Sequence, residues 1–134
     1  MNNQRSELSQ SNKYWIPKYR YLELKNFCLQ YPDWEKQIKE ISFLKAKTEI
    51  STSGNFSNPT EKLAIILEAS KSKMDLIETT AYLADPVLSK WILIAVTKAY
   101  TYEYLRYKLD MPAGRSMYYD RYRKFFYLLD QNRN

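Results

Sequence analysis

The stretch MPAGRSMYYDRYRKFFYLL, residues 111–129, decides which fold the chain adopts. Pro112 cannot continue a helix, and Gly114 can cap or bend the entry to the next helix without steric cost, so a break between two helices is expected there. After the break, the large apolar residues follow helical spacing. The stripe that they form consists of Tyr118, Tyr122, Phe125, Phe126 and Leu129. The pattern predicts a helix with an apolar face packed inward and a basic face turned outward.

The residues before this stretch predict the other parts of a helix-turn-helix. Asp85-Pro86 marks a helix start, and the following VLSKWILIAVT is apolar nearly all round, as expected of a buried helix. Thr101 is a candidate N-cap for a short amphipathic helix, YEYLRYKLD, residues 102–110. A short support helix, a turn with the apolar Met111 inside it and a longer third helix are typical of a helix-turn-helix.

The N-terminal half also has helical patterns. Two apolar stripes separated by Pro32 predict a helical hairpin, and Asn58, Pro59 and Glu61 form a capping box that opens a long helix. We therefore expect an all-α chain with no confident strand. Its expected parts are a disordered arm at 1–13, the hairpin at 14–47, a flexible loop at 48–58, the long helix at 59–84 and the helix-turn-helix region at 85–134.

The composition of the 134 residues excludes most catalytic classes. The chain has no histidine, one cysteine (Cys28) and two isolated glycines, so histidine triads, common zinc sites, P-loops and dinucleotide fingerprints cannot be written. We expect no enzyme, no metal and no cofactor. No apolar run reaches the roughly 18 residues that span a bilayer, and the polar N-terminus lacks a signal sequence. We expect a cytoplasmic protein that does not contact a membrane.

The net charge of +6 is unevenly distributed along the chain. Residues 1–25 carry five basic and two acidic side chains, residues 101–134 carry seven and four, and residues 26–100 carry nine of each. A basic surplus at the two ends favours a polyanionic partner over a general role in solubility. Double-stranded DNA is the partner that best fits a helix-turn-helix.

The outer face of the predicted last helix supplies the candidate DNA-binding residues. Recognition helices read base edges with their N-terminal residues, while basic residues further on hold phosphates. Basic side chains on the support helix can contact the DNA backbone nearby. Asp120 would oppose phosphates unless it pairs with Lys124 or accepts a hydrogen bond from a cytosine. The candidate residues are Arg106, Lys108, Arg115, Ser116, Tyr119, Arg123 and Lys124.

Two segments resemble a known group of proteins. TYEYLRYKLDMPAGRSMYYDRYRKFFYLLDQ, residues 101–131, and LQYPDWEKQIKEI, residues 29–41, resemble small proteins of phages and prophages of Gram-positive bacteria. More distantly they resemble phage late-gene transcriptional activators of the RinA/ArpU type. The resemblance implies a helix-turn-helix similar to region 4 of sigma factors, with Thr101–Asp110 as support helix and Arg115–Leu129 as recognition helix. The family often has cysteine where this chain has Ala113, and a small residue suffices for the turn.

The sequence thus favours a sequence-specific DNA-binding regulator of phage or prophage genes. Residues 14–83 would then contact RNA polymerase or a second copy of the chain. Two other functions stay open. A DNA-packaging protein like a terminase small subunit also joins a helix-turn-helix to an oligomerising helical region, and a helical adaptor would bind only proteins.

Overall fold

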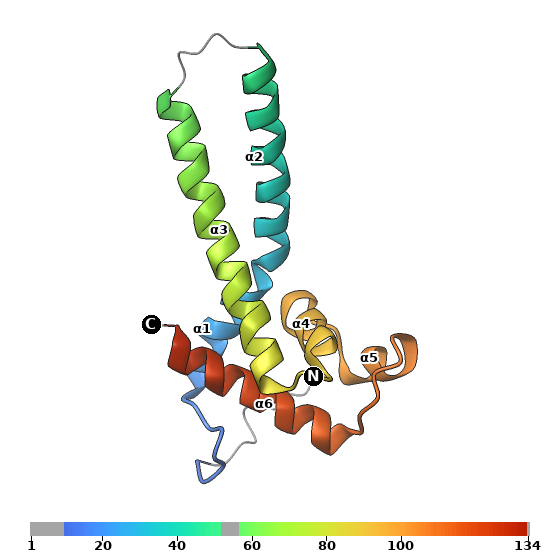
Figure 1. Ribbon diagram of the computed structural model, residues 1–134. Helices are drawn as coiled ribbons and strands as arrows, with labels where there is room; N and C mark the ends of the chain where they lie inside the picture. The colour runs from blue at the N-terminus through green and yellow to red at the C-terminus, as the bar shows by residue number, and fades with distance from the viewer. Residues whose placement is uncertain (1–9, 52–56, 134) are drawn as a thin grey trace. The chain divides into compact units, whose positions relative to one another are not determined.

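The computed structural model describes residues 10–51 and 57–133, except for the side chains of residues 48–51 and 57–60. The described residues form helices, turns and irregular segments and contain no strand, which confirms the all-α prediction (Figure 1). The helices are α1 (Lys18–Leu29), α2 (Tyr31–Ser51), α3 (Ser57–Ala84), α4 (Ser89–Lys98), α5 (Tyr102–Lys108) and α6 (Arg115–Asn132).

The chain divides into two compact units. The core unit contains the residues up to Gln30 and those from Leu76 onward, and the hairpin unit is Tyr31–Asp75. In the hairpin unit, α2 and the first part of α3 run side by side in opposite directions (Figure 1). The structure therefore does not confirm a hairpin at 14–47, because α1 belongs to the core unit and α2 pairs with α3.

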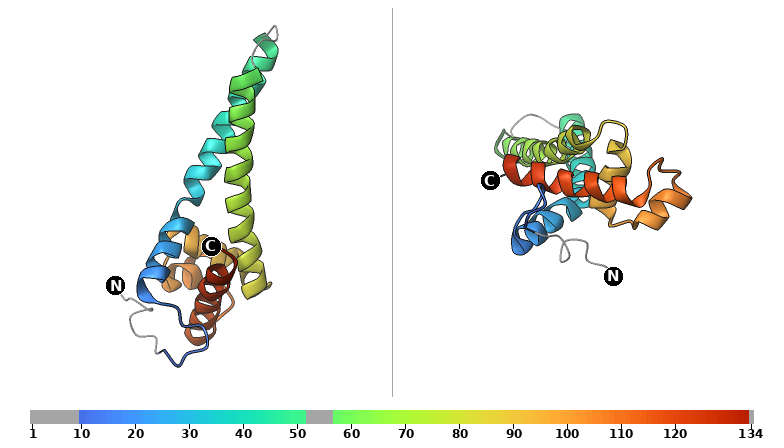
Figure 2. Two further views of the ribbon diagram at one scale, coloured as in Figure 1. Left: turned by 90° about the vertical axis from the view of Figure 1, so that its left-hand side faces the viewer. Right: turned by 90° about the horizontal axis from the view of Figure 1, so that it is seen from below.

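Aromatic packing explains why α1 joins the core unit. α1 packs against α4 and α6 (Figure 2). The Tyr21 ring meets the Phe126 ring edge-on with 5.1 Å between centroids, and the Tyr21 and Tyr122 hydroxyls lie 2.9 Å apart. The Arg20 guanidinium binds the Asp130 carboxylate at 2.6 Å. The predicted apolar face of α1 is buried, and it packs against α4 and α6.

The predicted inward stripe of α6 is confirmed. Tyr118, Phe125, Phe126 and Leu129 are all buried, and Tyr122 is half-buried. α4 contacts both α5 and α6. The face that α6 contributes to the core is therefore mainly aromatic.

Several predicted boundaries shift. α2 continues to Ser51 and α3 begins at Ser57, so helix covers both ends of the predicted loop at 48–58, and residues 52–56 lie outside the described residues. Asn58 lies inside α3 rather than before it. The arm predicted at 1–13 extends into described structure, since the amide of Trp15 donates to the Asn12 carbonyl at 3.0 Å. Residues 1–9 lie outside the described residues.

Candidate nucleic-acid interface

The turn between α5 and α6 is held by three hydrogen bonds around a buried methionine. The Met111 side chain is fully buried, and its amide donates to the Leu105 carbonyl at 3.0 Å. The Trp91 indole N–H donates to the Leu109 carbonyl at 2.8 Å, and the Arg106 guanidinium donates to the Met111 carbonyl at 2.9 Å. Met111 thus fills the turn as predicted, and Arg106 contributes to the turn itself.

The residue that needs unusual backbone freedom in this turn is Asp110. Its φ of 56° lies in the left-handed region, which aspartate tolerates better than most residues. Gly114 instead has φ −78° and ψ 177°, an extended conformation open to any residue, and a Cβ placed there would meet nothing within 4 Å. Gly114 is the N-cap of α6, so it caps the entry to this helix as predicted, whereas the left-handed backbone conformation in the turn belongs to Asp110.

The first turn of α6 is tied to the first turn of α5. The Tyr102 hydroxyl donates to the Ala113 carbonyl at 3.2 Å. The Arg115 guanidinium binds the Glu103 carboxylate at 2.5 Å and lies 4.7 Å from the centre of the Tyr102 ring. The hydrogen bond from Arg115 lowers the pKa of Glu103 below its usual value. Arg115 is thus exposed but already oriented by two neighbours.

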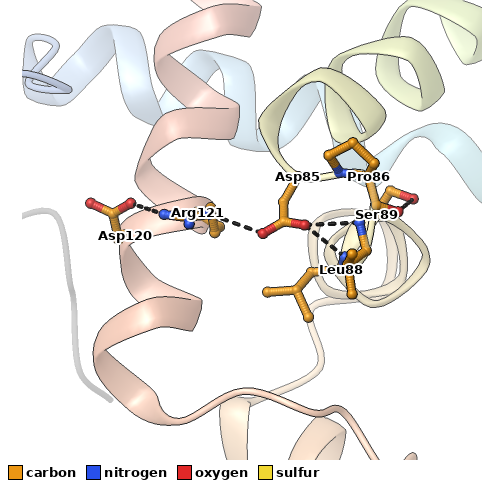
Figure 3. A network of polar contacts seen from close by, with 7 residues as sticks. Asp85, Pro86, Leu88, Ser89, Asp120 and Arg121 are labelled. Carbon is orange, nitrogen blue, oxygen red and sulfur yellow. Dashed lines mark hydrogen bonds and ion pairs between the residues drawn. The ribbon is translucent and has the colours of Figure 1, made fainter.

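A second network, shown in Figure 3, joins α6 to the residues before α4. The Asp85 carboxylate accepts hydrogen bonds from the amides of Val87 and Leu88 at 2.8 and 3.0 Å, and it binds the Arg121 guanidinium at 2.9 Å. Arg121 also binds Asp120 at 2.5 Å. Asp85 was predicted to cap the helix itself, but α4 begins at Ser89 with Leu88 as its N-cap, and the Asp85 carboxylate instead holds the turn that precedes α4.

Arg121 is the residue of this region that the sequence analysis missed. It was assigned neither to the apolar stripe nor to the DNA-binding face. Its partner Asp85 lies 36 positions away, and no local spacing rule connects residues so far apart. For Asp120 the sequence left open a pair with Lys124 or a hydrogen bond from a cytosine, and the structure pairs it with Arg121. A carboxylate that would oppose phosphates is thus already neutralised.

The seven predicted DNA-binding residues fall into two groups. Exposed on α5 and at the start of α6 are Arg106, Lys108, Arg115 and Ser116. Half-buried further along α6 are Tyr119, Arg123 and Lys124. The exposed group thus lies on α5 and the first turn of α6, on either side of the turn that joins them, and the exposed acidic residues Glu103 and Asp110 belong to the same segment.

The half-buried group is less available than predicted. The Tyr119 ring lies 4.9 Å from the Tyr118 ring and 6.1 Å from the Tyr102 ring, so it extends the aromatic core. Burial raises the pKa of Tyr119 above its usual value. The Nε of Arg123 is enclosed and has no hydrogen-bond partner among the residues that the structure describes. A phosphate oxygen could not reach this atom without movement of its neighbours.

The Asp85 network leads to a stability prediction. Burial would raise the pKa of Asp85, but hydrogen bonds from Leu88, Arg121 and Val87 outweigh it and lower the pKa below its usual value. The ionised Asp85 carboxylate therefore stabilises the fold. Because its folded-state pKa is depressed, this contribution to stability is present above the unfolded-state pKa of about 3.9 and disappears as pH falls through the folded-state pKa. Asp85→Ala should lower the free energy of unfolding by about 1–3 kcal/mol at pH 7.

Urea unfolding at pH 7 and pH 3 measures this effect. The difference between wild type and Asp85→Ala should be smaller at pH 3. The control is Asp75→Ala, which removes an exposed carboxylate of the hairpin unit and should change stability by less than about 0.5 kcal/mol. An equal effect of Asp85→Ala at both pH values would contradict the account.

The described residues contain no group of three histidine, cysteine, aspartate or glutamate side chains that could hold a metal ion. Within residues 10–51 and 57–133, no helix is both long and apolar enough to cross a bilayer. No protein-family model, curated protein or solved structure significantly matches the chain.

Proposed function

We propose that the chain is a sequence-specific DNA-binding regulator that controls transcription of phage or prophage genes. α4, α5 and α6 act as a helix-turn-helix, with α5 as support helix and α6 as recognition helix in the major groove of double-stranded DNA. In this role the chain binds DNA and catalyses no reaction. RNA polymerase is a further partner of the proposed regulator.

The observation that carries the proposal is that the basic residues of α5 and of the first turn of α6 are exposed on both sides of the α5–α6 turn. Arg115 and Ser116 project from the N-terminal turn of an 18-residue helix, where free backbone N–H groups also favour a phosphate. Arg106 and Lys108 at the end of α5 add two positive charges next to them. This combination suits contacts to bases from α6 and contacts to the DNA backbone from both helices.

The orientation of Arg115 supports base readout. Its contact with Tyr102 and its ion pair with Glu103 restrict the guanidinium before DNA arrives, which reduces the side-chain entropy lost on binding. Arginine bidentate to guanine is the commonest specific contact in the major groove. Glu103 binds the same guanidinium, so Arg115 must leave this ion pair in order to contact a base. Where the DNA carries a different base at that position, Arg115 stays paired with Glu103.

The phage or prophage setting rests on the resemblance of residues 101–131 and 29–41 to late-gene activators. The resemblance places the support and recognition helices at the residues that form α5 and α6. A DNA-packaging protein would use the same surface but would assemble into a ring.

The test is selection of DNA from a random duplex pool by the purified chain at physiological salt. The proposal predicts enrichment of one sequence motif, and the Arg115→Ala chain should lose preference at one or two positions of it. A pool that stays unenriched although the chain binds DNA at low salt would refute sequence-specific regulation. A ring of eight or more subunits would favour packaging.

A further inference from the structure

Among the side chains that the structure describes, the hairpin unit exposes four large apolar ones. On α2, Phe43 is 67% exposed and Leu44 46%, and on α3, Ile65 is 68% exposed and Ile66 40%. In contrast, Trp34 and Ile41 on α2 are buried. Clustered exposed apolar side chains are typical of interaction sites, whereas scattered ones need no explanation. The question is therefore whether these four side chains lie together.

The register of the two helices places them at one level. Gln37 bonds Ser70 at 2.6 Å, and the Lys73 ammonium lies 5.5 Å from the centre of the Trp34 ring. In an antiparallel pair, each step forward on α2 matches a step back on α3. The same register puts residue 43 opposite residue 64 and residue 44 opposite residue 63. Residues 43 and 44 of α2 and residues 65 and 66 of α3 thus lie within one helical turn of each other along the hairpin.

Helical geometry also places them on one side. Leu44 follows the buried Ile41 by three positions, and Ile66 precedes the buried Ser70 by four. Because the helices run in opposite directions, these two offsets turn the side chains to the same side of the seam between α2 and α3. Phe43 and Ile65 lie on the outer shoulders of that side. We call these four residues the hairpin patch.

We propose that the hairpin patch is the surface through which two copies of the chain associate, with their hairpins forming a four-helix bundle. Two amphipathic hairpins that face each other bury their apolar sides in this arrangement. The contact is isologous, so each copy contributes the same residues. Because the association involves only the hairpin unit, it requires no DNA and goes beyond the proposed function.

Charge favours a second copy as the occupant. Residues 31–75 carry seven acidic and seven basic side chains, so the whole net charge of +6 lies in the rest of the chain. Two copies can meet through this unit without net repulsion, while a strongly acidic partner would be drawn to the core unit. Beside the patch, Lys39 and Glu40 border Phe43 and Leu44 in an open hollow of about 430 Å³. A two-fold axis can bring such opposite charges of two copies together.

Sedimentation equilibrium of the full chain, without DNA, tests the proposal. Between about 5 and 200 μM the mass should rise from 16.1 kDa towards twice that value. Leu44→Glu and Ile66→Glu should each weaken the association at least tenfold, because two buried carboxylates would face an apolar surface. The matched control is Ser42→Glu. Ser42 is exposed and follows Ile41 by one position, which places it on the other side of the seam, so this variant should associate as the wild type does.

Phe43→Glu is a second variant that tests association without disturbing the fold. Since Phe43 is largely exposed, the variant should keep the helical circular dichroism of the wild type and still associate more weakly. A wild-type chain that stays at 16.1 kDa up to 200 μM would overturn the proposal. So would folded Phe43→Glu and Leu44→Glu chains that associate normally, or an assembly larger than a dimer. A monomer that binds selected DNA would refute this inference and leave the proposed function standing.

Discussion

Phe125→Ala is expected to lower the free energy of unfolding by about 3–5 kcal/mol. The Phe125 side chain is fully buried, and its ring meets the Phe126 ring edge-on at 4.9 Å. Alanine would leave a cavity in α6, the helix that packs against both α1 and α4. Since a small domain has a total stability of about 5–15 kcal/mol, a large part of the core unit's stability would be lost. Urea unfolding followed by circular dichroism at 222 nm measures the change.

Met117→Ala is the matched control on the same helix. Met117 is 48% exposed, so its truncation should change stability by less than about 0.5 kcal/mol. If Phe125→Ala unfolded within about 1 kcal/mol of the wild type, the packing of α6 described above would be wrong.

Arg115→Ala should weaken binding to the selected DNA about tenfold or more and leave the fold intact, because it removes a proposed base contact from an exposed position. Arg121→Ala should instead destabilise the fold. Arg121 lies six positions further along α6 and binds Asp85 and Asp120, so its loss should lower the melting temperature. Fluorescence anisotropy with labelled DNA and a thermal melt of each variant separate the two effects.

Lys18→Ala serves as a charge control for Arg115→Ala. Lys18 is exposed at the start of α1, away from the proposed DNA-binding surface, and its removal should leave the affinity nearly unchanged. Wild-type affinity of the Arg115→Ala chain would contradict the placement of the recognition helix.

Local signals predicted much of the fold. The 3–4 spacing predicts the buried faces of α1 and α6, and residue type and position predict the N-cap at Thr101. These features depend on residues within about two helical turns of each other, so they are visible in the sequence. The burial of Met111 in the turn followed from the break at Pro112 in the same way.

Partners distant in the sequence could not be predicted. The apolar stripe of α1 indicates that another element covers it but does not identify that element. The sequence predicts a hairpin with the next helix, which the structure does not confirm, whereas α1 packs against α4 and α6. The ion pair between Arg121 and Asp85 has the same cause. Tyr119 was placed on the outer face because helical phase alone cannot show that Tyr102 of another helix extends the aromatic core to meet it.

The salt dependence of DNA binding tests the central claim most directly. Arg106, Lys108 and Arg115 are the exposed basic residues of the proposed interface, and they would neutralise about two to three phosphates. The logarithm of the affinity should therefore fall against the logarithm of the salt concentration with a slope of about −2 to −3 per subunit. Binding of the chain to selected and to scrambled duplexes is followed by fluorescence anisotropy from low to physiological salt. Base contacts resist salt, so the two affinities should separate as salt rises, and Arg115→Ala should narrow the separation. Equal affinities for the two duplexes at every salt concentration would contradict sequence-specific recognition by α6.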